Sequence, residues 1–126
     1  MTEFDQWIAD EVARTGPFTA LLVLTQIDER DVTPVCSTYV NVIGAEVDWS
    51  EMTVLLAGSG VRWDGVSFFV VTAEGGGPLP NVQARLRLGE VETAIREDRL
   101  HLNRGHFFDV LGRRMQVDEV TATGSD

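Results

Sequence analysis

The sequence contains no lysine and only one cysteine among its 126 residues. Because Cys36 has no second cysteine to pair with, no disulfide bond within the chain can hold the fold together. All ten basic residues are arginines. Arginine suits planar, bidentate contacts at interfaces, but a GC-rich genome produces the same bias and is the simpler explanation.

Long apolar runs and targeting signals are also absent. The longest apolar runs cover residues 20–24 and 68–71, far short of the roughly 20 residues that span a bilayer. No signal peptide or lipidation motif is present. We therefore expect no membrane partner, and a protein that stays in a reducing interior unless it is carried outside as part of a particle.

Positive charge is scarce. Acidic residues outnumber basic ones by 20 to 10, for a formal net charge of −10. Residues 1–81 carry twelve acids and three arginines, whereas residues 82–126 carry eight and seven. A chain without a net positive field does not collect a nucleic-acid backbone or an anionic membrane surface. We expect no direct sequence-specific nucleic-acid binding, and solubility is the simplest use of the acidic surface.

What is present fits a single β-rich domain. The 44% of hydrophobic residues can form a core, and the length fits one domain over residues 1–126. The patterning predicts an α+β fold, mostly β: an antiparallel sandwich or a partly open barrel with one N-terminal amphipathic helix. We expect that helix in residues 1–16, the β-rich core in residues 18–120, and a frayed tail in residues 121–126.

The N-terminal helix is indicated by its cap and its apolar stripe. Thr2 suits the N-cap position, and Gly16 with Pro17 suits the end of the helix. The apolar residues at helical spacing are Phe4, Trp7, Ile8 and Val12. This stripe either packs on the sheet, which is the favoured interpretation, or docks on a partner. Trp7 is therefore a candidate partner contact.

Most of the remaining chain is predicted as strands. The expected strands are residues 18–27, 35–43, 52–57, 61–63, 66–71, 82–88 and 100–102, with 117–120 closing the sheet. Asp64 and Gly65 are typical of a type I′ hairpin between two of them. Residues 106–115 fit a helix or a pair of strands turning near Gly112. We favour strands, because glycine weakens a helix.

A glycine- and proline-rich connection at residues 73–81 precedes the alternating segment 82–88. Within this loop, Leu79 either touches a partner, together with Pro78 and Pro80, or plugs the loop onto its own domain. In the following predicted strand, Arg85 and Arg87 share the polar face. These five residues complete the set of candidate partner contacts.

No metal or cofactor site is expected. His101 and His106, the only histidines, lie five residues apart with Asp109 nearby. This is not the spacing of a helical ligand pair, and no cysteine set accompanies it. The three carboxylates in residues 28–31 lack the glycine and distal glutamate of an EF-hand loop, so a solvated turn is the better interpretation.

No catalytic motif is expected either. Gly58, Ser59 and Gly60 follow a predicted strand, but a hairpin comes next where a phosphate-binding loop needs a helix. There is no Gly-x-Ser-x-Gly motif, and Cys36 has the setting of a packed, inert thiol. We therefore predict a protein that is not an enzyme and uses no cofactor.

Residues 61–88 resemble a pattern in minor tail proteins of long-tailed phages, the lambda-like tail-tip protein L and its relatives. Those chains often show a W-x-G-x-x-(F/Y) hairpin, a spacer with glycine and proline, and an alternating P-x-x-x-L-x-(I/L/V) strand. The matching residues here are Trp63, Gly65, Phe68, Pro78 to Pro80, Leu86 and Leu88. The chain differs by extra residues between Cys36 and Trp49. It also lacks a cysteine cluster, so the iron–sulfur feature of some relatives is not implied.

The resemblance implies a structural virion component, a tail or tail-junction protein. Such a protein is made in the host cytoplasm and assembles as a ring with copies of itself and other particle proteins. The contacts would be its loops, its termini and its sheet edges. The acidic surface would then suit a channel through which DNA slides without sticking.

The charge distribution fits a second class of protein equally well. An acidic cytosolic inhibitor or immunity-type protein covers a basic site on a toxin or nuclease, and opposite charge speeds the encounter. A small enzyme or ligand-binding barrel is a third class, but it needs a pocket that the sequence does not show. We rank structural assembly first, the inhibitor second and the enzyme third.

Overall fold

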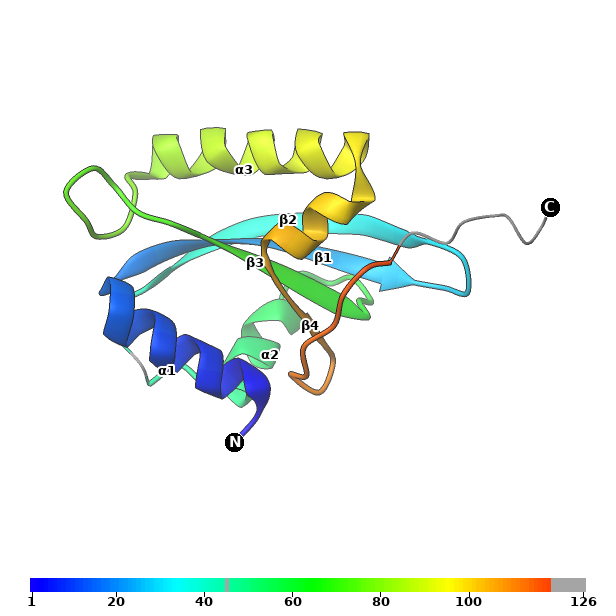
Figure 1. Ribbon diagram of the computed structural model, residues 1–126, viewed down its shortest axis with the longest axis horizontal. Coiled ribbons are helices and arrows are strands. Elements are labelled where there is room, and N and C mark those ends of the chain that lie inside the picture. Colours follow the sequence, from blue (N-terminus) through cyan, green and yellow to red (C-terminus); the bar gives the residue numbers. More distant parts are fainter. Residues whose placement is uncertain (45, 119–126) are drawn as a thin grey trace.

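The fold is an open four-stranded antiparallel sheet between two layers of helices. The computed structural model describes residues 1–44 and 46–118 (Figure 1). The strands lie in the order β2-β1-β3-β4. In chain order the elements are α1 (Glu3–Thr15), β1 (Phe18–Ile27), β2 (Val32–Val42), α2 (Trp49–Ala57), β3 (Gly65–Val71), α3 (Asn81–Glu97), the 3₁₀ helix η1 (Arg99–Arg104) and β4 (His106–Asp109).

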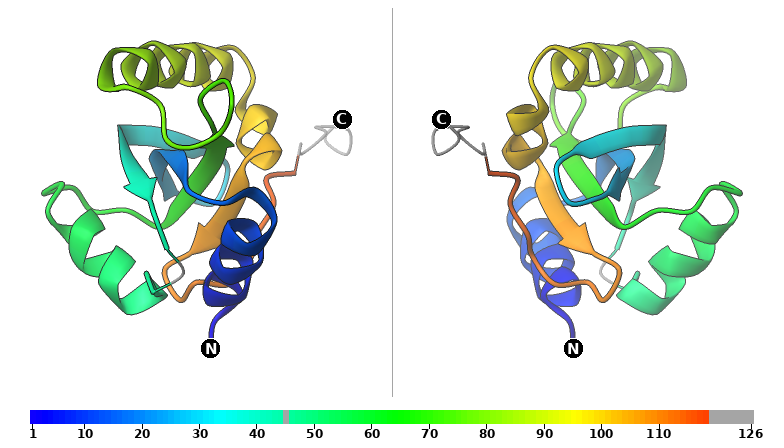
Figure 2. Two further views of the ribbon diagram at one scale, coloured as in Figure 1. Left: turned by 90° about the vertical axis from the view of Figure 1, so that its left-hand side faces the viewer. Right: turned by 90° about the vertical axis from the view of Figure 1, so that its right-hand side faces the viewer.

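The predicted class is confirmed: the protein is α+β, with an antiparallel sheet and an N-terminal helix. The sheet is open and does not close into a barrel. Helices make up 38% of the structure and strands 28%, so helix exceeds strand. Figure 2 shows the layers end-on, with α1 and α2 on one side of the sheet and α3 on the other.

Helix α1 begins and ends where the sequence indicates. Thr2 and Asp5 form a capping box, in which each side chain accepts a hydrogen bond from the other residue's backbone N–H. Gly16, with a φ of 78°, ends the helix in a conformation that favours glycine. The predicted apolar stripe packs on the sheet, and Phe4, Trp7 and Ile8 are buried there.

Strand β1 is the centre of the sheet, and its side chains alternate between the two cores. It pairs with β2 on one side and with β3 on the other, so Leu22 lies opposite both Thr38 and Phe68. Leu22 and Phe68 join the core under α1 and α2, whereas Leu21 and Val23 join the core under α3 and η1. A continuous apolar strand is thus buried on both faces.

The core under α1 and α2 is built around one phenylalanine. The ring centroid of Phe4 lies 5.0–5.5 Å from four other aromatic rings at tilted or edge-on angles. Those rings come from α1, α2, β3 and β4, and they are Trp7, Trp49, Phe68 and Phe108. Such geometry is favourable for aromatic quadrupoles, so this cluster ties four elements together.

The strand predicted at residues 52–57 is wrong, because this segment is most of helix α2. Asp48 caps the helix by accepting a hydrogen bond from the N–H of Glu51. Met52 and Leu56, four residues apart, face the core, whereas Val54 and Leu55 are exposed. A short apolar run does not by itself distinguish a buried strand from a helix. The N-cap residue Asp48 is the signal in the sequence that indicates a helix here.

The strand predicted at residues 82–88 is also wrong, because this segment begins helix α3. Its apolar alternation stops at residue 88, while a helical spacing continues through the buried or half-buried residues Ala84, Leu88, Val91 and Ile95. Pro80 stands immediately before the helix, where a missing N–H costs nothing. Most residues of the segment are good helix formers.

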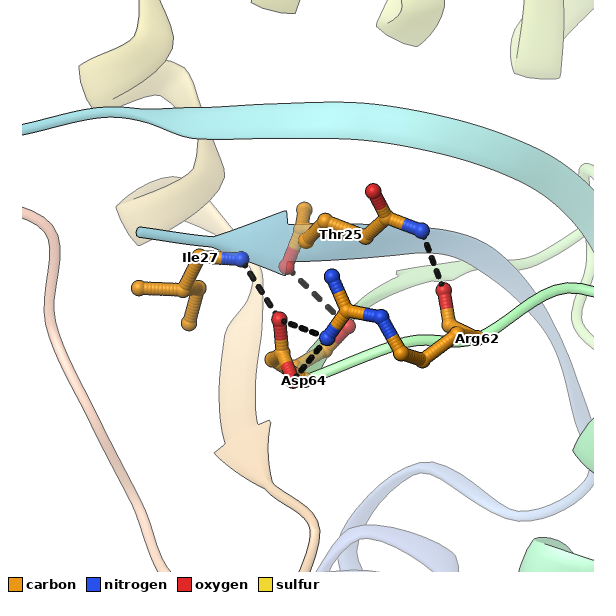
Figure 3. A network of polar contacts seen from close by, with 6 residues as sticks. Thr25, Ile27, Arg62 and Asp64 are labelled. Carbon is orange, nitrogen blue, oxygen red and sulfur yellow. Dashed lines mark hydrogen bonds and ion pairs between the residues drawn. The ribbon is translucent and has the colours of Figure 1, made fainter. Parts of the chain in front are cut away.

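The hairpin predicted at Asp64 and Gly65 does not form, because residues 61–63 are not a strand. Instead, Asp64 fastens the chain to the end of β1 (Figure 3). Its N–H donates to the carbonyl of Thr25 at 2.7 Å, and its carboxylate accepts from the N–H of Ile27 at 2.8 Å. Strand β3 therefore starts at Gly65, in register with β1.

The last part of the chain follows the prediction in outline. Residues 100–102 belong to η1 and do not form the expected short strand. Residues 106–115 do form a strand and a returning segment that turns near Gly112, as favoured over a helix. Residues 117 and 118 are not in a strand, and the expected frayed tail lies outside the described residues.

Candidate functional site

The two edges of the sheet differ. The edge at β4 is covered by the returning chain: the N–H of Met115 donates to the carbonyl of Phe107 at 2.9 Å, and the N–H of Asp109 donates to the carbonyl of Arg113 at 2.8 Å. An isolated bridge also joins Phe108 to Arg114. Residues 113–115 thus occupy the backbone groups that β4 would offer to another strand.

The edge of the sheet at β2 has no neighbouring strand, and we call it the β2 edge. Strand β2 pairs only with β1; the carbonyl of Val32 accepts a hydrogen bond from Arg99, but no backbone group of residues 33–42 is bonded to a described segment other than β1. None of its eleven residues is charged. In the first third of the strand, Pro34 and a register shift opposite Leu24 and Thr25 hinder pairing with another strand. Residues 36–42 contain no such feature. Exposed edges of this kind are templates for pairing with another strand.

A groove runs beside the β2 edge under the C-terminal half of α3. Its walls are Val35, Cys36 and Ser37 from β2, with Glu92 and Arg96 from α3, and its volume is about 190 Å³. The hydroxyl of Ser37 donates a hydrogen bond to the carboxylate of Glu92, which fastens the helix to the strand. A strand added at the edge could place a side chain in this groove.

The candidate contacts predicted from the sequence do not form one surface. Trp7 lies buried under the sheet, 6% exposed. Leu79 is buried on the opposite face, and its N–H donates to the hydroxyl of Thr19. It therefore plugs the loop onto its own domain, the second interpretation left open by the sequence. Pro78 is half-buried, while Pro80, Arg85 and Arg87 are exposed at or on α3.

The two histidines are separated by the sheet. The His101 ring stacks on Phe69 in the core beneath α3, and the His106 ring stacks on Trp7 beside α1, with centroids 4.6 Å apart. In residues 1–44 and 46–118, no group of three potential ligand side chains is placed to hold a metal ion. Each histidine therefore packs as an aromatic ring against its own core.

Titratable groups cluster where α1 meets β4. Glu11 is buried; burial alone would raise the pKa of its carboxyl, but hydrogen bonds from Thr15 and Arg14 outweigh this and lower it. Burial lowers the pKa of His106, and the charge of Arg114 lowers it further. The cluster joins two elements of the fold and opens into no described cavity, so we assign it a structural role.

The glycines at residues 58 and 60 belong to a helix end. They follow α2, and the N–H groups of residues 58–60 donate to the last carbonyls of that helix. The next element is strand β3, so no helix N-terminus lies directly after these residues. Across the described chain, no helix has the length and apolar character needed to cross a bilayer.

Comparisons with protein families, with curated proteins and with solved structures found no match to this chain. The case for function therefore rests on the surface of the molecule. Sequence reasoning missed the β2 edge, although Pro34 was a usable signal because proline within a sheet is confined to edge strands. The predicted strand began at residue 35, one position too late to include it.

Proposed function

We propose that the protein is a non-enzymatic assembly component, specifically a tail or tail-junction protein of a phage particle. The observation that carries the assembly role is the β2 edge, a free and uncharged strand beside a groove. A neighbouring particle protein would add an extended segment there, bound by main-chain hydrogen bonds and by a side chain in the groove. The phage setting rests only on the residue pattern of segment 61–88, because the hairpin and the second strand that accompany this pattern in the tail proteins do not form here.

A ring closed by strand pairing alone would need two open sheet edges on every copy. One edge is covered by residues 113–115, so a sheet cannot run continuously around a ring unless that segment moves. We therefore propose that the β2 edge binds a different surface or a different particle protein. Ring assembly stays a prediction that depends on further contacts.

A charged residue placed on the β2 edge tests the proposal. Thr38→Lys puts a positive charge in the unprotected part of the strand, and charge on an edge blocks strand addition. Thr33→Lys is the matched control, because Thr33 is also exposed on β2 but lies next to Pro34. The tagged protein is co-expressed with the other tail proteins of the phage that encodes it, and the captured proteins are identified by mass spectrometry.

We expect the wild type and Thr33→Lys to capture the same tail protein, and Thr38→Lys to lose it. Two results would overturn the proposal. One is a protein that is strictly monomeric and captures no particle protein. The other is unchanged capture by Thr38→Lys, which would place the contact elsewhere on the surface.

A second candidate function, the acidic inhibitor, is favoured by a different surface. A hollow lies between the β1–β2 turn, the start of η1 and residues 115–118. Its rim carries the carboxylates of Asp28, Glu29, Asp31, Asp98 and Asp118, and its floor is apolar. Arg30 and Arg99 line it too, so five carboxylates face two arginines. The guanidinium of Arg99 donates to the carbonyls of Val32 and Ile95. An acidic rim over an apolar floor suits the long stem and charged head of a basic residue.

The inhibitor interpretation makes a separate prediction about salt. Binding to a toxin or nuclease encoded beside the gene should weaken steeply as ionic strength rises, because the contact would be between opposite charges. Titration calorimetry at two salt concentrations measures this. A gene flanked by capsid and tail genes, with no toxin gene beside it, would count against this candidate and leave the first in place.

A further inference from the structure

Helix α3 presents an apolar stripe to solvent on the face opposite the sheet. Val82 is 71% exposed and Leu86 is 64% exposed. Gly89 and Thr93 continue the stripe, since they follow at spacings of three and four residues. A shallow hollow on this face is lined by Leu86, Gly89, Glu90, Thr93, Ala94 and Glu97. Two large apolar side chains on one helix face, beside a hollow, form a surface that can pack against another helix.

The glycine in this stripe has no use within the chain. Gly89 lies in the interior of α3, where glycine is the least favoured residue apart from proline. Its φ is not positive. A side-chain carbon built at this position would meet no atom within 4 Å. Neither backbone conformation nor close packing within the subunit therefore calls for glycine, whereas close approach of an outside backbone would.

The charges of α3 oppose its own dipole. The N-terminal half carries Arg85 and Arg87 and no acidic residue, while the C-terminal half carries Glu90, Glu92 and Glu97 against Arg96. Acidic residues near the start of a helix and basic ones near its end stabilise it, so this distribution is mostly reversed. The N-cap, Pro80, adds no side-chain hydrogen bond. Arg87 pairs with Glu90 one turn along the helix at 3.4 Å, but both side chains are exposed and such a pair contributes little. A neighbouring helix of opposite direction would add further partners of opposite charge at both ends.

We infer that the outer face of α3 binds the same face of a second copy, with the two helices antiparallel and crossing at Gly89. About this centre, Arg85 and Arg87 lie level with residues 91–93 of the second copy, next to its acidic half. The two-fold axis repeats this complementarity, and the helix dipoles also oppose each other. Leu86 of each copy then packs beside Gly89 and Thr93 of the other.

This dimer goes beyond the strand contact proposed at the β2 edge and uses a different surface of the subunit. Helix α3 has 17 residues and is about 25 Å long. A single pair of helices gives a small interface, so we expect a dissociation constant of roughly micromolar size. The second copy is the favoured occupant because the face is complementary in charge to itself when reversed.

Charge reversal tests the pairing. The double variant Arg85→Glu with Arg87→Glu makes both halves of α3 acidic, and the double variant Glu90→Arg with Glu97→Arg makes both halves basic. We expect each variant alone to be monomeric in sedimentation velocity runs at concentrations where the wild type is dimeric. A one-to-one mixture should dimerise again, because each half then meets its opposite. All four side chains are exposed, so folding should not change.

Two single variants test the packing. Leu86→Glu should abolish the dimer, while Val54→Glu, on the equally exposed outer face of α2, should leave it intact. Gly89→Ala should raise the melting temperature of the monomer by roughly 4 °C, because alanine favours helix. The same change should weaken the dimer at least tenfold, since the added methyl groups separate the two backbones.

A wild type that stays monomeric at high micromolar concentration would overturn the inference, as would a mixture of charge variants that fails to dimerise. A Gly89→Ala variant that dimerises as well as the wild type would also contradict the proposed crossing point. None of these results bears on the β2 edge. Conversely, loss of tail-protein capture by Thr38→Lys would leave the α3 dimer untouched, so the two proposals fail separately.

Discussion

At the scale of single residues, Glu11 is the only charged side chain in the described chain that is buried. Arg14 donates to both of its carboxylate oxygens at 2.6 Å, and the hydroxyl of Thr15 donates at 2.7 Å. A buried charge is tolerated only when it is paired and hydrogen-bonded. Both partners lie in the same helix, so the pairing of the Glu11 carboxylate is completed within α1.

Replacing this carboxylate with an amide should destabilise the protein. Glu11→Gln keeps the shape but removes the charge that Arg14 and Thr15 bind, and we expect a loss of about 1–2 kcal/mol at pH 7. Because the pKa of Glu11 is lowered in the folded state, the wild-type advantage should be present above pH 4.5 and lost as the pH falls through the folded pKa. Urea unfolding of both proteins at pH 7 and below pH 4 measures this. An equal difference at both pH values would contradict the assignment.

His106 should make the protein sensitive to mild acid. Burial lowers the pKa of His106 below its usual value of 6.5, so the unfolded chain binds a proton more readily than the folded chain. Stability should therefore be full above pH 6.5 and should decline as the pH falls from 6.5 through the folded pKa. In His106→Gln that decline should be absent, although the variant is less stable at pH 7. Melting curves from pH 8 to pH 5 compare the two slopes.

At the scale of elements, Asp64 acts as the clamp between β1 and β3. Its carboxylate binds the N–H of Ile27 and also pairs with Arg62 at 2.9 Å (Figure 3). The bond to the backbone is the more important of the two, because Arg62 is 67% exposed and an exposed ion pair contributes little.

Removing the clamp should therefore cost more than removing its ionic partner. We expect Asp64→Ala to lower the free energy of unfolding by about 1–3 kcal/mol, since a charged hydrogen bond to a half-buried N–H is lost. Arg62→Ala should change it by less than about 1 kcal/mol. Chemical unfolding of the two variants side by side measures the difference. Equal losses would mean that the ion pair, and not the backbone bond, holds the two strands.

A helix or strand could be predicted from the sequence where its local residue pattern agrees with the way the segment packs in the fold. Helix α1 and strand β1 were predicted correctly, because a capping box and a doubly buried run are strong local signals. The segment in α3 was mistaken for a strand because its four apolar residues alternate with a period of two, although in the helix Val82 and Leu86 are exposed and only Ala84 and Leu88 face the core. Only the four-three-four spacing from Ala84 to Ile95 indicates the helix, and it extends past the alternating stretch.

The candidate site depended on facts that local patterns do not contain. Which strand lies at an edge is set by pairing between distant segments, such as the register that joins β1 to both β2 and β3. Trp7 and Leu79 were proposed as contacts because they are large and apolar, but both lie in the cores. The exposed arginines at residues 85 and 87 were correctly identified as surface residues, though on a helix and not on a strand.

At the scale of the whole molecule, the covered edge at β4 limits how the sheet can extend. Opening it should change the state of association. Met115→Pro removes the N–H that donates to the carbonyl of Phe107, so the protein would have an open edge on each side of the sheet. We expect growth into large, concentration-dependent aggregates.

Light scattering during incubation at increasing concentration tests this expectation. Met115→Ala is the matched control, because it loses the same packing but keeps the N–H. If both variants aggregate equally, the lost side chain is responsible and the covered edge is not. If neither aggregates, residues 113–115 do not limit sheet extension.

The two-fold contact inferred at α3 has a consequence for symmetry. An assembly that keeps this contact contains an even number of copies, since every copy is matched with one other. A pair related in this way also looks the same from either end, whereas a ring threaded on a phage tail has a leading side and a trailing side. An odd number of copies in a particle would therefore show that the dimers dissociate before the protein is incorporated. The dimer would then be a storage form that exists only outside the particle.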